Sequence, residues 1–203
     1  MNPLPVVLYG DLVRLEPLDY VHADQLLEEA QDEEIWRYMP IPCPTTREQM
    51  LDQINKAWQA AAATLEVPFA ILDDATDRAI GSTRFLDIKR HDRALEIGWT
   101  WLGTAHQRTG VNTECKYLLL RHAFEELGAI RVQLKTDRRN QRAQRAIERL
   151  GAVKEGTFRK HRLMWDGVVR DTVYYSILDS EWQGVKQRLE GFLERGRSPV
   201  QSA

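Results

Sequence analysis

The chain has 203 residues, of which 43% are hydrophobic, and its formal net charge is −2. This length suits one compact domain with a sizeable core, and the near-neutral charge argues against nucleic-acid binding by the molecule as a whole. No apolar run approaches the ~20 residues that cross a bilayer, and the N-terminus lacks a basic region followed by a long apolar stretch. We therefore expect a cytoplasmic protein that engages no membrane and does not bind nucleic acid directly.

Strand and helix signals alternate along the first half of the chain. A proline-rich break at residues 40–44 separates the first two elements from a long helix. In chain order, the expected elements are a strand at 12–17, a helix at 20–30, a helix capped by Thr45 or Thr46 that runs to about Ala63, and strands at 69–72, 80–88 and 95–102. The last three strands are expected to form an antiparallel meander.

The second half continues as helix, strand, helix and then hairpin. Gly128 and Gly151 lie just past two helix ends, where they serve as C-caps, and Asp166-Gly167 is a strong hairpin-turn signal. The expected elements are a helix at 112–127, a strand at 131–136, a helix at 140–150, hairpin strands at 153–165 and 168–178, and a helix at 180–193. This order predicts one α/β domain over residues 1–194, with a disordered tail at 195–203.

Residue types typical of metal and disulfide sites are sparse. Cys43 and Cys115 lie far apart and outside any CxxC pair, so we expect reduced thiols. The five histidines show no metal-ligand spacing. No metal is therefore expected.

A short segment between the strand at 95–102 and the helix at 112–127 has the form of an anion-binding loop. It reads Gln107-Arg108-Thr109-Gly110-Val111-Asn112-Thr113. A loop in this position aims a row of backbone N–H groups and the positive end of a helix dipole at one point, which suits a phosphate or pyrophosphate. The sequence therefore predicts a phosphorylated cofactor.

The strand before this loop contains a glycine, which weakens a strand unless a bulge or a close backbone approach requires it. Strict alternation places Leu95, Ile97, Trp99 and Trp101 on one face, and Glu96, Gly98 and Thr100 on the other. Gly98 is either a bulge that accommodates the neighbouring tryptophans or part of the same functional region as the loop.

Together, the glycine-containing strand, the loop at 107–112 and the segment at 140–151 resemble the GNAT superfamily of acyl-CoA-dependent N-acetyltransferases, and more narrowly its RimJ/RimL-type branch. The resemblance covers roughly residues 11–182. It implies a mixed, mostly antiparallel sheet with a splayed parallel pair of strands and helices on both faces. It also makes a homodimer an expectation.

The resemblance further implies that acetyl-CoA binds as co-substrate. Its pyrophosphate would lie on the loop amides, and its pantetheine arm would run between the strands at 95–102 and 131–136 as an added strand. Asn140 would contact the arm near the sulfur, or serve as an ordinary helix N-cap, or do both. The expected cofactor contacts are Trp99, Thr100, Trp101, Leu102, Gln107, Arg108, Thr109, Gly110, Val111, Asn112, Thr113 and Asn140.

Attack on a thioester requires a neutral amine, so a base must accept a proton from an ammonium substrate. Glu96 is the first choice for this catalytic role, because it lies on the cofactor-binding strand. The alternative is an ordinary ion pair between Glu96 and Arg84 or Arg93. A backbone N–H near Trp99 or Thr100 would hold the oxyanion.

The chain departs from the family pattern at three positions. Asn112 replaces the second glycine of the loop, and Ile147 and Ala143 stand where relatives carry a tyrosine or a serine that protonates the leaving thiolate. No general acid is therefore assigned.

Other residues admit more than one interpretation. A stripe of arginines on the helix at 140–150 is a solvated face, a contact to the CoA phosphates or an RNA-binding surface; it consists of Arg138, Arg142, Arg145 and Arg149. Trp36 and Tyr38 either shape one wall of the acceptor cleft or pack within the protein.

Three functions remain in order of preference. The first is transfer of an acetyl group from acetyl-CoA to a primary amine, on a protein N-terminus or a small molecule. The second is a CoA-binding module with little or no turnover, and the third is RNA binding by the arginine stripe. The sequence does not identify the amine acceptor.

Overall fold

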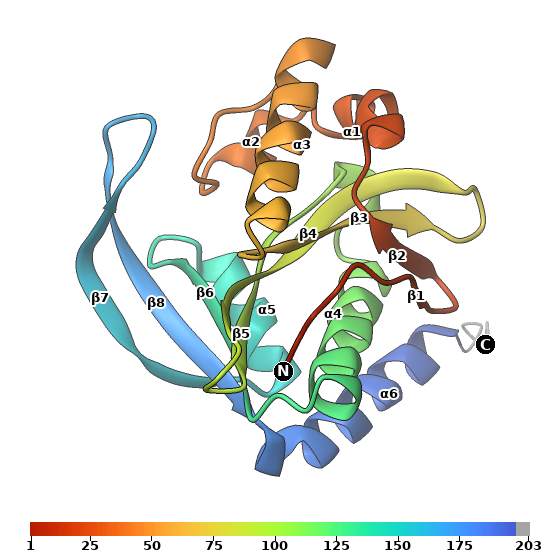
Figure 1. The fold of residues 1–203 in the computed structure, drawn as a ribbon, viewed down its shortest axis with the longest axis vertical. Helices are drawn as coiled ribbons and strands as arrows, with labels where there is room; N and C mark the ends of the chain where they lie inside the picture. The colour runs from red at the N-terminus through yellow and green to blue at the C-terminus, as the bar shows by residue number, and fades with distance from the viewer. Residues whose placement is uncertain (198–203) are drawn as a thin grey trace, which may run out of the picture.

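The computed structural model describes residues 1–197 and shows an eight-stranded sheet in the order β1-β2-β3-β4-β5-β6-β8-β7 (Figure 1). Neighbouring strands run antiparallel except β5 and β6, which run parallel. The strands are β1 (Leu8–Tyr9), β2 (Val13–Pro17), β3 (Val67–Asp73), β4 (Arg78–Lys89), β5 (Ala94–Leu102), β6 (Arg131–Asp137), β7 (Val153–Leu163) and β8 (Val169–Leu178). The predicted sheet, including the meander and the parallel pair, is confirmed.

Helices lie on both faces of this sheet, as predicted (Figure 1). One face carries α1 (Ala23–Glu29), α2 (Glu33–Trp36) and α3 (Arg47–Ala62); the other carries α4 (Val111–Arg121), α5 (Gln141–Leu150) and α6 (Trp182–Arg197). Short 3-10 turns occur at Tyr20–His22, Thr104–His106 and Asp179–Glu181, and a π-helical turn at His122–Glu126 extends α4.

Differences from the predicted elements lie mainly at their ends. The short elements β1 and α2 were not predicted, because two and four residues are too few to show a periodic hydrophobic pattern. The predicted disordered tail is wrong for residues 195–197, which continue α6. Leu189 and Leu193 bury one side of α6 and so stabilise it up to its last turns. Residues 198–203 lie outside the described residues.

A β-bulge interrupts β5 in the middle of the sheet. Ser82 of β4 pairs with Trp101, and Arg84 pairs with Gly98. One residue therefore separates the pairs on β4, whereas two separate them on β5. The extra residue adopts a left-handed conformation at Trp99, with φ of 53°. The glycine signal in the sequence is thus explained by a bulge, with the positive φ one residue further on.

The bulge changes which way the end of β5 faces, and it overturns one prediction. Leu95 and Ile97 pack in the core beneath α4, α5 and α6, whereas Trp101 packs against Trp36 in the core beneath α1 to α3. The expectation that Trp101 shares a face with Leu95 is wrong, because the extra residue shifts the alternation by one.

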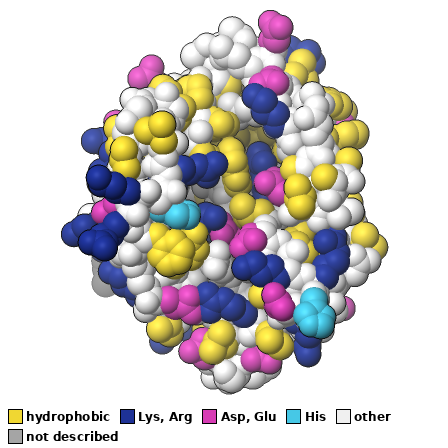
Figure 2. Space-filling view, turned by 60° about the vertical axis from the view of Figure 1, so that its left-hand side comes forward, with side chains coloured by type: hydrophobic (Ala, Val, Ile, Leu, Met, Phe, Trp, Pro, Cys, Tyr) yellow, Lys and Arg dark blue, Asp and Glu magenta, His cyan; other side chains and the backbone are white. Residues whose placement is uncertain are grey.

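The hairpin of β7 and β8 leaves one of its faces without a helix. Val173, Tyr175 and Ile177 point into the core beneath α5 and α6, so the alternate residues face the opposite side. Those residues are Arg170, Thr172, Tyr174 and Ser176. In the described part of the chain no helix lies along that face of the hairpin (Figure 1). Figure 2 brings this side forward and shows acidic, basic and hydrophobic side chains around a hollow.

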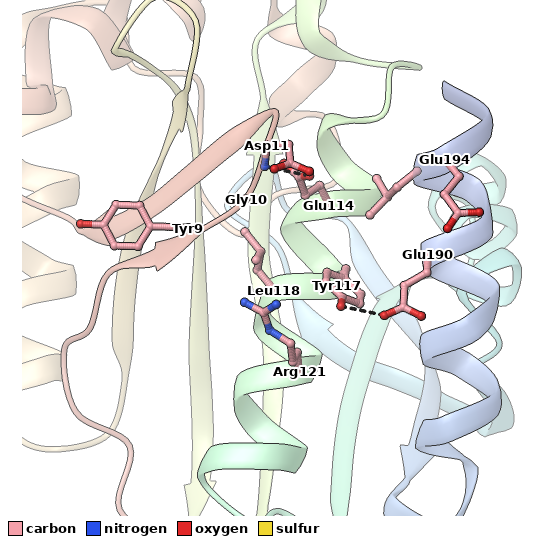
Figure 3. Close-up of a pocket in the computed structure, with 10 residues that line it drawn as sticks. Tyr9, Gly10, Asp11, Glu114, Tyr117, Leu118, Arg121, Glu190 and Glu194 are labelled. Atoms are coloured by element: carbon pink, nitrogen blue, oxygen red, sulfur yellow. Dashed lines mark hydrogen bonds between the residues drawn. The ribbon is translucent and has the colours of Figure 1, made fainter. Parts of the chain in front are cut away.

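Glu114 joins the N-terminal strands to α4 (Figure 3). Its buried carboxylate accepts backbone N–H groups of Asp11 at 3.1 Å, Leu12 at 2.6 Å and Val13 at 2.8 Å. Gly10 makes this approach possible, because a Cβ there would lie 2.5 Å from a Glu114 oxygen. The turn between β1 and β2 is thereby fixed against the helix that follows the loop.

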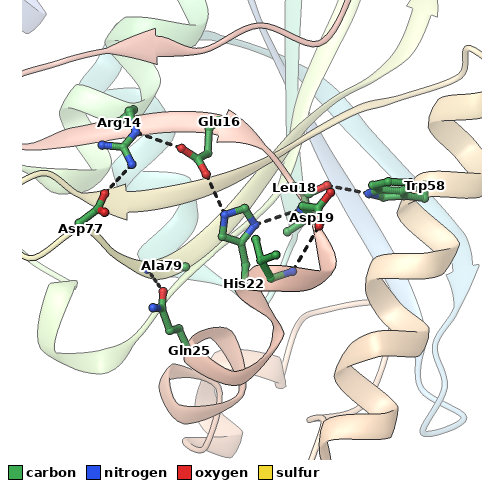
Figure 4. Close-up of polar contacts among 10 residues, drawn as sticks. Arg14, Glu16, Leu18, Asp19, His22, Gln25, Trp58, Asp77 and Ala79 are labelled. Carbon is green, nitrogen blue, oxygen red and sulfur yellow. Dashed lines mark hydrogen bonds and ion pairs between the residues drawn. The ribbon is translucent and has the colours of Figure 1, made fainter.

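A second set of polar contacts fixes the turn between β2 and α1 (Figure 4). His22 Nδ1 accepts the Asp19 N–H at 3.0 Å, and its Nε2 lies 2.9 Å from a Glu16 oxygen. Trp58 of α3 donates to the Leu18 carbonyl at 2.7 Å. These contacts hold the helical layer of α1 and α3 in place over the sheet.

Replacing Glu114 tests the link between the N-terminal strands and α4. In Glu114→Gln an amide NH₂ faces backbone donors, so we expect the free energy of unfolding to fall by about 3 kcal/mol, as for hydrogen bonds to a charged group. Urea denaturation measures this. The exposed Glu126→Gln is the matched control and should change stability by less than about 0.5 kcal/mol. Equal effects of the two substitutions would contradict this role of Glu114.

Candidate active site

Strands β5 and β6 pair over three residues and then separate. The pairs are Ala94 with Arg131, Leu95 with Val132 and Glu96 with Gln133, although both strands continue further. Their outer edges are occupied by β4 and β8. The remaining inward-facing N–H and C=O groups therefore border a gap that another extended chain can fill.

The loop between β5 and α4 presents a row of backbone amides at one end of this gap. Arg108 turns the chain with φ of 61°. Among the described residues no protein acceptor is found for the N–H groups of Arg108, Thr109, Gly110, Asn112 and Thr113. These groups stand at the N-terminus of an 11-residue helix, whose dipole adds positive potential. The arrangement fits a phosphate or pyrophosphate.

Side chains hold the loop in this conformation. Thr109 Oγ1 donates to the His106 carbonyl at 2.8 Å and accepts the Val111 N–H at 3.2 Å. Gln107 Nε2 donates to the Leu102 carbonyl at 2.9 Å. The Leu102 carbonyl, part of a predicted cofactor contact, therefore already accepts one hydrogen bond within the protein and keeps a second lone pair for a ligand.

Two arginines of the stripe on α5 reach the loop and the start of α4. Arg142 donates to Gln107 Oε1 and Arg149 to Thr113 Oγ1, both at 2.6 Å. Arg145 is exposed between them. The arginine stripe therefore lies beside the row of loop amides. Of the interpretations given above, this position favours contact with an anion bound to those amides over a purely solvated helix face.

Asn140 caps α5. Its Oδ1 accepts the Ala143 N–H at 2.9 Å, so the predicted N-cap role is confirmed. Its amide nitrogen has no hydrogen-bond partner among the described residues, which leaves a donor for a ligand at the end of β6.

Glu96 lies where β5 and β6 separate, and it is 1% exposed. Its Oε2 accepts Lys135 Nζ at 2.9 Å and Gln133 Nε2 at 2.8 Å. Glu96 therefore does form an ion pair, as the alternative predicted, but its partner is Lys135. Arg84 and Arg93, the expected cations, instead contact Glu66 and the Gly128 carbonyl.

The second oxygen of Glu96 faces the bulge. A Cβ at Gly98 would lie 3.0 Å from Glu96 Oε1 and 3.0 Å from a Leu86 methyl carbon. The absence of a side chain at Gly98 therefore leaves room for Glu96 Oε1, which lies on the side of the bulge.

Lys116 is a buried site residue that sequence reasoning missed. It is 6% exposed, and Nζ donates to Thr100 Oγ1 at 2.5 Å, beside Thr83. No carboxylate pairs with it among the described residues. Burial lowers the pKa of the Lys116 ammonium, and burial raises the pKa of the neighbouring Cys115 thiol to about 11. In the sequence this lysine resembles any polar residue of an amphipathic helix.

Of the two aromatic candidates for the acceptor wall, Trp36 is buried and donates to the Ala30 carbonyl at 2.8 Å, so it packs within the core. Tyr38 is half-buried, with the Arg139 guanidinium 5.6 Å from its ring centre. Only Tyr38 remains a candidate for the wall.

Within residues 1–197, no group of three or more His, Cys, Asp or Glu residues is arranged to hold a metal ion. None of the helices described there is long and apolar enough to span a membrane.

Comparison with known proteins identifies the family. Residues 13–153 match the family described as "Acetyltransferase (GNAT) domain". The chain belongs to the GNAT acetyltransferases. It is 31% identical over 144 residues to the Bacillus subtilis (strain 168) protein named "Putative ribosomal N-acetyltransferase YdaF", covering 70% of this chain and 76% of that one.

Solved GNAT structures agree with this assignment. A GCN5-related N-acetyltransferase from Brucella melitensis superposes with a TM-score of 0.92 at 28% identity, covering 100% of this chain and 92% of the other. Mycobacterium smegmatis RimJ, solved in complex with CoA-disulfide, shares the fold at a TM-score of 0.80 and 18% identity, over 93% and 95% of the two chains. These relatives are consistent with the RimJ/RimL-type branch.

The GNAT match spans every predicted site residue from Glu96 to Asn140 but ends at Val153. Most of the hairpin, whose uncovered face carries Arg170 and Tyr174, lies beyond the matched residues. The family match therefore covers the gap and the loop, whereas most of the hairpin lies outside it.

The excess of positive charge around the hairpin can be tested by titrating the nearby His161. Burial and the positive charges of Lys135, Arg170 and Arg162 lower the pKa of His161 below its usual value of about 6.5. We expect an NMR titration to give a midpoint below 6.5, and Arg170→Met to raise that midpoint. A midpoint that does not move in Arg170→Met would show that the two side chains are not neighbours.

Proposed function

We propose that this GNAT protein transfers an acetyl group from acetyl-CoA to a primary amine, on a protein N-terminus or a small molecule, by direct attack of the amine on the thioester. The observation that carries the proposal is the row of loop amides without protein acceptors, placed beside a gap between parallel strands.

The residues present fit acetyl-CoA. The amides from Arg108 to Thr113 would hold the pyrophosphate, and the edges of β5 and β6 would border the pantetheine arm. Bound acetyl-CoA supplies a thioester that an amine can attack. Only main-chain groups are needed at the loop, so Asn112 in place of a glycine does not prevent this contact.

We assign the base role to Glu96 Oε1, which faces the bulge while Oε2 is bonded to Lys135 and Gln133. The carboxylate accepts a proton from the ammonium, directly or through water, and so leaves a neutral amine. The amine then attacks the thioester: the N–C bond forms, the C–S bond breaks, and the second amine proton passes to water. The departing thiolate takes its proton from water. Ile147 and Ala143 have hydrocarbon side chains without an ionisable group, so neither serves as the acid.

Removing the backbone N–H of Gly110 tests whether the loop amides bind the pyrophosphate. Gly110 has φ of −69°, which proline also adopts, so Gly110→Pro removes this N–H without forcing the backbone angle. Gly110→Ala is the matched control, because it adds a Cβ in the same place, 2.8 Å from a Leu12 methyl carbon, but keeps the N–H. We expect calorimetry to show CoA binding about tenfold to a hundredfold weaker in Gly110→Pro than in Gly110→Ala.

Equal CoA affinity in the two Gly110 variants would overturn the placement of the pyrophosphate. An RNA-binding function would instead appear as RNA affinity that falls steeply with salt and is insensitive to Gly110→Pro.

Glu96→Gln separates proton transfer from binding. We expect the rate of CoA thiol release with an amine acceptor to fall by about 100-fold or more near pH 7, while CoA affinity stays within about twofold. The deficit should shrink as the pH rises toward the pKa of the amine, because the free amine then needs no base.

A deficit that is independent of pH would assign Glu96 a structural role. A protein that binds CoA but releases no thiol across peptides and small amines would be a CoA-binding module, and the proposed activity would be wrong.

A further inference from the structure

Arg170 of β8 is a buried arginine whose guanidinium has no hydrogen-bond partner among residues 1–197. It is 7% exposed, its Nε is fully enclosed and unbonded, and no hydrogen bond or ion pair to its guanidinium is found among the described residues. An unpaired buried charge is costly, and natural proteins rarely keep one without a reason.

The nearest carboxylates are already committed. Asp137 accepts the N–H, Nε and Nη2 groups of Arg139 at 2.6 to 3.0 Å, and Glu96 is bonded to Lys135. Burial alone would raise the pKa of Asp137, but the hydrogen bonds from Arg139 and the charge of Arg170 bring it below its usual value. Asp137 thus helps Arg170 to remain charged without occupying its donors.

The surroundings of Arg170 carry an excess of positive charge. Arg162 lies opposite it in the β7–β8 register, and Lys135 stands on the same face of the sheet. The positive charges of all three lower the pKa of His161. The uncovered face of the hairpin is therefore set up for an anion, and Arg170 supplies buried donors that the described protein leaves free.

The position of Arg170 connects it to the proposed acceptor side. Its face of the sheet also carries Glu96, Lys135 and Tyr174. Burial lowers the pKa of the Arg170 guanidinium, and the negative charge of Glu96 is near enough to oppose that shift by raising it. Phe158 and His161 line an open hollow of about 720 Å³ on β7, next to Thr172 and Tyr174. A molecule whose amine approaches Glu96 can therefore extend along this face toward Arg170.

We propose that Arg170 binds a carboxylate of the amine acceptor, so that the acceptors of this enzyme are amines that also carry an acidic group. This rests on the proposed acetyl transfer. The free guanidinium of Arg170 matches one carboxylate, whose two oxygens fit a planar pair of N–H groups. The carboxylate is either the α-carboxylate of an amino acid or an acidic side chain of a peptide near its N-terminus.

Matched acceptor pairs test the selectivity. Thiol release is measured for amino acids against their amides, and for peptides with Asp against the same peptides with Asn. We expect the acid to be favoured at least tenfold in kcat/KM in one set, which identifies the source of the carboxylate. No preference for the acid in either set would overturn the proposal.

Arg170→Met removes the donors and keeps the apolar stem. It should raise KM for the acid about tenfold or more, leave the neutral partner unchanged, and be rescued in part by Arg170→Lys. Arg188→Met, the same change at an exposed position on α6, should alter neither acceptor. Equal losses for acid and neutral acceptors in Arg170→Met would show that the residue acts only on the fold.

Stability gives an independent readout. Arg170→Met relieves an unpaired buried charge, so its melting temperature should be unchanged or higher. Arg84→Met is the contrast, because Arg84 is equally buried but pairs with Glu66 at 2.8 Å, and its loss should lower the melting temperature. A large destabilisation by Arg170→Met would indicate a structural arginine.

A binding experiment does not require turnover. N-acetylglycine, as a carboxylate probe, should shift the NMR signals of His161 and Arg170 saturably in the wild type and not in Arg170→Met, whereas N-acetylglycinamide should shift neither. Saturable binding without acetyl transfer to any amine would refute the proposed activity and keep the carboxylate site. Acetyl transfer with no saturable binding of the acid would refute the site alone.

Discussion

The bulge in β5 is the constraint on which the site depends. Without the extra residue between Gly98 and Trp101, β5 would continue in register and nothing would turn its inner edge away from β6. A non-glycine residue with positive φ, here Trp99, costs roughly 1–3 kcal/mol, so its surroundings must hold it. Arg84 stacks 4.3 Å from the Trp99 ring centre on one side, and Thr100 is bonded to Lys116 on the other.

Polar groups concentrate where the gap and the hairpin meet, while apolar groups fill both cores. Lys116 lies beneath the gap, Glu96 with Lys135 lies above it, and Arg170 lies further along the uncovered face. Lys116, Glu96 and Arg170 are buried and Lys135 is half-buried, so their electrostatic interactions are stronger than in water. Glu96 and Lys135 neutralise each other, so the field felt by a ligand on this face is set mainly by the arginines of the hairpin.

Periodic segments and caps could be predicted from the sequence, because they depend on neighbours along the chain. Thr46, Asn140 and Gly151 cap helices as expected. The face of Trp101 could not be predicted, since one inserted residue reverses the alternation. Partners far apart in the sequence could not be predicted either, because nothing in the local sequence distinguishes Lys135 from Arg84 as the partner of Glu96. Arg170 looks like an ordinary hairpin arginine until the structure shows it enclosed.

The same distinction explains why sequence reveals the reaction class more readily than the acceptor. In the proposed function the loop and the strand edges bind acetyl-CoA through main-chain N–H and C=O groups, which every residue but proline supplies in full. Asn112 in the loop would not disturb such contacts. The proposed selection of an acceptor depends instead on individual side chains brought together from β6, β7 and β8. Their arrangement follows from strand register and twist. A single substitution among them can change the acceptor preference while the fold and the proposed cofactor contacts stay the same.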